Sequence, residues 1–131
     1  MYKTILCAIE LNLEGERILS KAQEIARKFE SKLILISVLP YTFLPKDYQK
    51  ELKEKATPEF NAIADKFGIS KKNRVLKVGK PYQAICIESA KKGADLIILG
   101  THSKKGVNSL IGSTATGVAN HAKCDVSLVR I

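Results

Sequence analysis

The stretch LILISVL, from Leu33 to Leu39, is apolar at nearly every position. Continuous rather than alternating hydrophobicity is typical of a strand in a parallel sheet that helices cover on both faces. Shorter apolar runs on either side of it predict four further strands, at residues 3–9, 74–78, 94–99 and 126–131, of which 74–78 is the weaker. The sequence therefore predicts a buried sheet of five strands.

The segments between these strands carry helical signals. Asn12 stands just ahead of the acidic Glu14 and Glu16, as the start of a helix prefers. Apolar residues then recur at steps of three and four, at Ile18, Leu19, Ala22, Ile25, Ala26 and Phe29. A second helix begins near the turn Gly79-Lys80-Pro81, because proline suits the first helical turn, and runs to about Lys92.

The region after Pro45 keeps helical spacing but contains a proline. Proline lacks a backbone N–H and crowds the preceding turn, so a kink or break is expected near Thr57-Pro58. The apolar residues that keep the spacing are Leu52, Ala56, Phe60, Ile63, Ala64 and Phe67.

Strands that alternate with helices through mostly short loops imply right-handed crossovers and a doubly wound, Rossmann-like parallel sheet. The fold class expected is α/β, as a single domain over residues 1–131, since 131 residues with 45% hydrophobic content suffice for one core. Ligands in such folds bind outside the carboxyl ends of the strands, near the point where the strand order reverses.

Composition and residue spacing indicate the cellular compartment and argue against a metal site. Residues 1–9 lack the pattern of a secretory signal and no apolar run approaches about 18 residues, so a soluble cytoplasmic protein is expected, with no membrane association. Cys7, Cys86 and Cys124 stand far apart, without the spacing of metal ligands. Reduced thiols and no intrinsic metal site are the expectation.

The charge balance favours anionic partners. Lys and Arg total 22 against 13 Asp and Glu, a formal net charge of +9, which would attract nucleotides, nucleic acid or acidic protein surfaces. The lysines are scattered in pairs without interleaved aromatic residues, a zinc-finger pattern or a helix-turn-helix pattern. No specific recognition of nucleic acid is therefore expected.

A glycine-bearing loop follows the strand at residues 94–99, and helical spacing resumes only at Ala115. Gly112-Ser113 therefore falls at a helix start, where free N–H groups and the helix dipole favour an anion. Gly100 permits a sharp turn, and Ser113 or Thr114 can add a hydroxyl donor. Glycines at turns and serines at helix starts are also common where no ligand binds. The loop is not a Walker A motif, and no GxGxxG follows the first strand.

The sequence resembles the universal stress protein family over essentially its whole length. The resemblance rests on YKTILCAIEL, the helix after it, the turn Gly79-Lys80-Pro81, ADLIILGTHS and LIGSTATGVANHAKCDVSLVRI. It implies a five-stranded sheet of the adenine nucleotide alpha hydrolase-like kind. It also implies, for the nucleotide-binding branch, a G-x2-G-x9-G-[ST] motif that cradles the phosphates of ATP.

By this resemblance Gly100 and Gly112-Ser113 match the motif, Ser103 stands where the second glycine is usual, and the spacer 104–111 is one residue shorter. Glu10 corresponds to the acidic residue, usually Asp, that ends the first strand. His102 lacks a catalytic partner motif, so no catalytic residue is expected. The nucleotide-binding residues that the resemblance implies are Ala8, Ile9, Glu10, Val38, Leu99, Gly100, Thr101, His102, Ser103, Gly112, Ser113 and Thr114.

The function expected is a cytosolic stress-response or regulatory protein that binds ATP with little or no turnover, at most slow hydrolysis. Mg²⁺ would accompany only the nucleotide, protein partners stay unidentified, and a homodimer would form through the C-terminal strand. The alternative is a dimeric scaffold or chaperone-like interaction protein of the same family that does not bind ATP. An enzyme of the wider superfamily is disfavoured because no SGGxDS loop follows the first strand.

Overall fold

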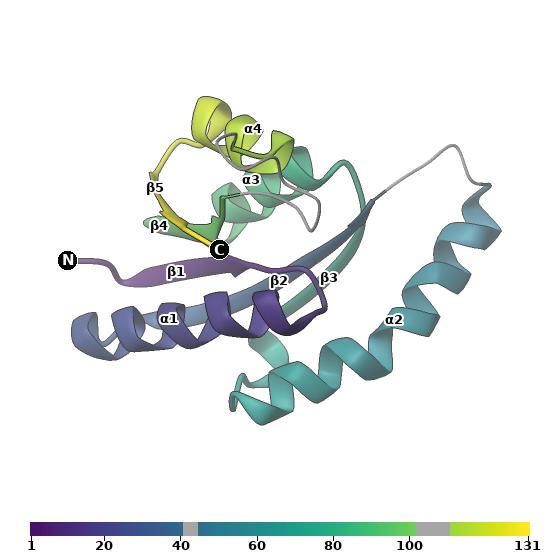
Figure 1. The fold of residues 1–131 in the computed structure, drawn as a ribbon, viewed down its shortest axis with the longest axis horizontal. Coiled ribbons are helices and arrows are strands. Elements are labelled where there is room, and N and C mark those ends of the chain that lie inside the picture. Colours follow the sequence, from purple (N-terminus) through teal and green to yellow (C-terminus); the bar gives the residue numbers. More distant parts are fainter. Residues whose placement is uncertain (41–44, 102–110) are drawn as a thin grey trace.

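The computed structural model describes residues 1–40, 45–101 and 111–131 and confirms the predicted α/β class (Figure 1). Five parallel strands form one sheet in the order β3-β2-β1-β4-β5. Within the described residues the elements are β1 (Thr4–Ala8), α1 (Leu13–Phe29), β2 (Lys32–Pro40), α2 (Lys46–Lys66), the 3₁₀ helix η1 (Lys71–Asn73), β3 (Arg74–Gly79), α3 (Pro81–Lys92), β4 (Leu96–Gly100), α4 (Ser113–His121) and β5 (Asp125–Val129).

The strand order reverses at the centre of the sheet. From β1 the chain builds outward through β2 to β3, and it then returns to place β4 and β5 on the other side of β1. The connections that follow β1 and β4 therefore diverge at the carboxyl ends of two neighbouring strands. In a doubly wound sheet this is the position where a ligand site forms.

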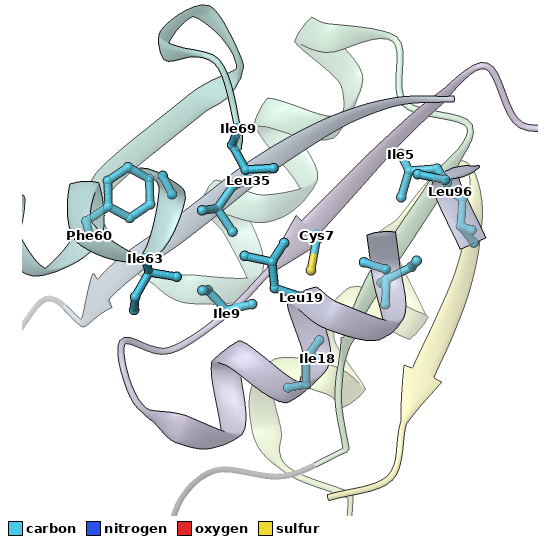
Figure 2. Packing of buried hydrophobic residues seen from close by; sticks show 14 residues of the cluster. Ile5, Cys7, Ile9, Ile18, Leu19, Leu35, Phe60, Ile63, Ile69 and Leu96 are labelled. Carbon is cyan, nitrogen blue, oxygen red and sulfur yellow. The ribbon is translucent and has the colours of Figure 1, made fainter. Parts of the chain in front are cut away.

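Side chains that alternate along each strand build two cores, one on each face of the sheet. Ile5 and Cys7 of β1 face α1 and α2, where they meet residues such as Leu19 and Phe60 (Figure 2). Leu6 and Ala8 of β1 face the opposite layer, which α3 and α4 cover. This burial on both faces explains why the central strands are continuously apolar in sequence.

Helix α2 departs from expectation at Pro58. The helix runs through this proline without interruption, so the predicted break is wrong, although the ribbon of α2 curves along its length (Figure 1). Pro58 cannot donate to the carbonyl of Glu54, but Glu54 is exposed and water can satisfy that carbonyl. The second half of the helix is held by buried Phe60 and Ile63.

The helices can also be compared with the thickness of a membrane. In residues 1–40, 45–101 and 111–131, no helix is long and apolar enough to cross a bilayer.

Asp95 ties the start of β4 to the start of β1. The amides of Thr4 and Lys3 donate to Oδ2 of Asp95 at 2.9 and 2.8 Å, and these bonds hold the pKa of the carboxyl below its usual value of about 3.9. A lowered folded-state pKa stabilises the fold above the unfolded-state value, and this contribution is lost as the pH falls through the folded-state pKa.

An Asp95→Asn variant is expected to lose that pH-dependent contribution, because its amide does not ionise. In urea titrations followed by circular dichroism, the gap between the wild-type and variant midpoints should be constant above about pH 5 and shrink below about pH 4. A gap that stays unchanged down to pH 2 would rule out the role of the carboxylate charge.

Candidate functional site

A cavity of about 360 Å³ opens at the carboxyl ends of β1, β2 and β4. It lies at the position that the reversal of strand order predicts. Nine of the twelve residues expected from the sequence line it: Ala8, Ile9, Glu10, Val38, Leu99, Gly100, Gly112, Ser113 and Thr114. The fold thus brings together residues that are up to 106 positions apart in the sequence.

The end of β1 is fixed by hydrogen bonds to β2. The amide of Ile9 donates to the carbonyl of Ile36 at 3.0 Å, and the buried hydroxyl of Ser37 donates to the carbonyl of Ile9 at 2.8 Å. The amide of Asn12 then donates to the carbonyl of Glu10 at 3.0 Å, which turns the chain toward α1. Glu10 is therefore held at the rim of the cavity with an exposed side chain.

Gly15 allows the turn after Glu10 to close. A Cβ added at Gly15 would stand 1.9 Å from the carbonyl oxygen of Glu10, much closer than any real contact. The amide of Gly15 also donates to Oδ1 of Asn12 at 2.8 Å, which caps the first turn of α1. The rim of the cavity at Glu10 therefore depends on a glycine that does not itself line the cavity.

Val38 can present its backbone to a ligand. Ile36 accepts a hydrogen bond from Ile9, so the peptide groups of Ile36 face β1, and those of Val38, two residues on, face the same side. Strand β1 ends at Ala8, whereas β2 continues to Pro40 beside β3. The N–H and C=O of Val38 thus point to the side where the neighbouring strand has ended and the cavity begins.

The absence of a side chain at Gly100 leaves room for two isoleucines that line the cavity. A Cβ at this position would lie 2.5 Å from Cδ1 of Ile131 and 2.7 Å from Cδ1 of Ile18. Both isoleucines line the cavity, so any larger residue at position 100 would push their side chains into it. Gly100 is the last residue of β4 and pairs with Val129, so the sharp turn predicted at this glycine is wrong, and its role is in packing.

The start of α4 offers backbone donors to the cavity. Gly112 is the N-cap and no side chain in the described part of the protein caps the helix. The amides of Ser113, Thr114 and Ala115 therefore lack an intrahelical partner, and the helix dipole adds partial positive charge there. The amide of Gly112 itself donates to the carbonyl of Thr101 at 2.6 Å. Donors for an anion must come from the three residues after it.

Three predicted residues are not among those that line the cavity. Thr101 is buried, extends the pairing of β4 by donating its amide to Val129 at 3.0 Å, and has no hydrogen-bond partner for its hydroxyl within the described residues. His102 and Ser103 lie outside the described residues.

Several lining residues were missed from the sequence. Pro81 begins α3, so the amino end of a second helix borders the cavity, and this position could have been predicted from the Gly-Lys-Pro turn. The others act through packing, and no local motif marks them: Ile18, Pro40, Ile85, Ala115 and Ile131.

The cavity has an apolar wall, an acidic rim and an uncapped helix start. In residues 1–40, 45–101 and 111–131, no group of three or more His, Cys, Asp or Glu residues could hold a metal ion. An elongated ligand with an apolar ring at one end and a negative charge at the other fits this arrangement best.

Fold and cavity together define a doubly wound α/β protein with an uncapped helix start at its switch point. The model of the universal stress protein family matches residues 1–130, and the chain belongs to this family. It is 36% identical over 141 residues to universal stress protein A homolog 2 of Coxiella burnetii, covering 99% of this chain and 96% of that relative.

Solved structures share the fold at lower sequence identity. Universal stress protein UspA from Lactobacillus plantarum superposes with a TM-score of 0.78 at 20% identity, over 98% of each chain. A universal stress protein crystallised in complex with cAMP superposes with a TM-score of 0.67 at 23% identity, over 98% of this chain and 97% of that one.

Proposed function

We propose that this universal stress protein binds ATP in the cavity at the carboxyl ends of β1, β2 and β4. The observation that carries the proposal is the uncapped start of α4, with the amides of Ser113, Thr114 and Ala115 beside Gly100. A complex of a related universal stress protein with cAMP supports an adenine nucleotide as the ligand class.

Each wall of the cavity suits one part of the nucleotide. Ala8, Ile9 and Val38 form an apolar surface for adenine, with the backbone of Val38 able to bond the ring edge. Glu10 can accept hydrogen bonds from the ribose hydroxyls. The first turn of α4 receives the phosphates, and Mg²⁺ would be held by the phosphates rather than by a cluster of protein carboxylates.

The role that follows is regulatory rather than catalytic. His102 lies outside the described residues, and no catalytic role is assigned to it. ATP occupancy would instead alter the surface around the glycine loop and thereby the binding of protein partners in the cytoplasm. Residues 1–131 act in this proposal as one domain.

A dimeric scaffold without ATP binding is the second candidate, and two contacts favour it. The amide of Gly112 is already engaged by Thr101, and the side chains of Ile18 and Ile131 pack over Gly100. Both contacts reduce the room and the donors that a phosphate group needs. This candidate differs from the first by a cavity that takes no nucleotide.

The C-terminal strand supports the proposed homodimer. In the described part of the chain β5 pairs only with β4, so its other edge has free backbone groups, and its residues from Val126 to Val129 are half-buried. Pairing with the same edge of a second copy would satisfy those groups. Multi-angle light scattering should give the mass of two chains, and the mass of a single chain at micromolar concentration would refute the dimer.

Mass spectrometry of ligands released from the purified protein tests the proposal directly. Protein is washed, denatured with acid and filtered, and the filtrate is compared with that of a Gly112→Asp variant purified in the same way. ATP or ADP in the wild-type filtrate and its depletion in the variant are expected. Equal amounts from both proteins would place the nucleotide elsewhere.

A further inference from the structure

Positive charge gathers at the edge of the sheet opposite the cavity. All five strands are parallel, so their amino ends meet at one edge together with the carboxyl ends of the helices. Figure 1 shows the N-terminus and the end of α1 together at the left of the view. We call this the amino edge. Nine exposed cations lie at this edge, at the ends of helices, at the starts of strands or in the turns between them: Lys3, Arg27, Lys28, Lys32, Lys71, Lys72, Lys91, Lys92 and Lys123.

These cations are not neutralised by the chain. Within the described residues none of the nine forms an ion pair, and the three ion pairs there are made by Lys66, Arg74 and Lys77. Three exposed carboxylates, Glu30, Asp95 and Asp125, lie at the same edge and offset only part of these nine positive charges. The amino edge therefore carries uncompensated positive charge.

Helix dipoles explain only part of this pattern. Arg27 and Lys28 end α1, and Lys91 and Lys92 end α3, where cations stabilise the last turn. The remaining five, Lys3, Lys32, Lys71, Lys72 and Lys123, precede or begin strands or lie in the 3₁₀ helix η1. Mutual repulsion among so many exposed cations costs stability unless an anionic partner offsets it.

A polar groove lies within the amino edge. It has a volume of about 550 Å³ and runs between the end of α1 and the turn from α2 to β3. Its lining includes the cations Arg27 and Lys32, the carboxylate of Glu30 and the uncharged polar side chains of Gln23, Ser31, Ser70 and Asn73. A depression lined by charged and hydrogen-bonding groups suits a chain of phosphates and sugars better than a flat surface with the same groups would.

An aromatic ring is exposed at the end of α1, on the same amino edge. The side chain of Phe29 is 40% exposed, and the ring of Tyr2 meets it edge-on with centroids 5.3 Å apart and planes at 88°. Phe29 is not among the residues that line the groove. A partly exposed ring held by a second ring is a platform on which a base can stack.

We propose that the amino edge binds single-stranded nucleic acid through its phosphate backbone, with little preference for sequence. The groove between α1 and the α2–β3 turn would take the strand, and the surrounding lysines would extend the contact. The cavity for the nucleotide lies at the other edge, so both ligands can be bound at once. An anionic bilayer also attracts lysines, but it is flat and cannot enter a groove.

Fluorescence anisotropy with a labelled 12-nucleotide oligouridine tests the proposal. Binding is expected at 50 mM salt, with log K falling against log salt by about 0.7 for each phosphate contact. An Arg27→Glu/Lys32→Glu double variant should raise Kd about tenfold or more and flatten that slope. Phe29→Leu, which keeps apolar bulk but removes the stacking face, should raise Kd about fivefold.

A matched control distinguishes binding at the groove from general attraction by the positive charge of the protein. The Lys53→Glu/Lys55→Glu variant makes the same charge change on exposed positions of α2. It should keep the wild-type Kd within about twofold, since both lysines lie away from the amino edge. Equal losses in the two double variants would overturn the proposal, as would binding to phosphatidylserine vesicles without binding to the oligonucleotide. Urea midpoints confirm that each variant is folded.

Discussion

A Gly112→Asp variant is expected to bind ATP about a hundredfold more weakly than the wild type while its fold keeps full stability. Gly112 has φ −64° and ψ 161°, which any residue can adopt, and Asp is a favoured N-cap. Its carboxylate would accept the amides of Thr114 or Ala115, the donors proposed for the phosphates. The same change thus caps the helix and closes the anion site.

The size of the effect follows from the bonds that are lost. Two hydrogen bonds to a charged group contribute about 3 kcal/mol together, which corresponds to about a hundredfold in Kd, and charge repulsion adds to this. Gly112→Asn, which also caps but carries no charge, should weaken binding by about tenfold. Calorimetric titration gives both values. Wild-type affinity in the Asp variant would exclude the start of α4 as the phosphate site.

A Gly15→Ala variant is expected to unfold at a lower urea concentration, with a net loss of about 2 kcal/mol. Alanine usually stabilises a helix relative to glycine by about 1 kcal/mol. Here the new methyl would stand 1.9 Å from the carbonyl oxygen of Glu10, which is backbone and cannot rotate away. Crowding of this kind costs about 3 kcal/mol and outweighs the gain in helix propensity.

The same variant should also weaken ATP binding, because relief of the contact moves Glu10 from the rim of the cavity. Gly79→Ala is the matched control, since a Cβ at Gly79 meets no atom within 4 Å. That control should change stability by less than about 0.5 kcal/mol. An unchanged or raised urea midpoint for Gly15→Ala would contradict the close approach of Glu10 to α1.

The sequence predicted the fold well because hydrophobicity dominates its strands. Burial on both faces makes β2 continuously apolar, and Asn12 caps α1 as its position predicts. Pro58 does not break α2, because the second half of the helix is anchored by packing of Phe60 and Ile63 that a local rule does not include. The strand at the C-terminus is Asp125–Val129 rather than 126–131.

The cavity residues that belong to a motif could be predicted from the sequence. Those that reach the cavity only through packing could not. The family resemblance named nine of the lining residues in advance, at the ends of β1, β2 and β4 and at the start of α4. Ile131 and Ile18 reach the cavity from distant elements, and only the folded backbone brings them to Gly100. The hydrogen bond from Gly112 to Thr101 likewise has no sequence signal, although it decides which amides remain for a ligand.

The central claim is that the cavity holds ATP, and calorimetric titration of nucleotide-free wild-type protein with ATP and Mg²⁺ tests it most directly. We predict saturable binding of one ATP per chain with a submillimolar Kd, and its loss in Gly112→Asp. Absence of binding to folded wild-type protein at millimolar ATP would contradict the account and leave the dimeric scaffold as the function.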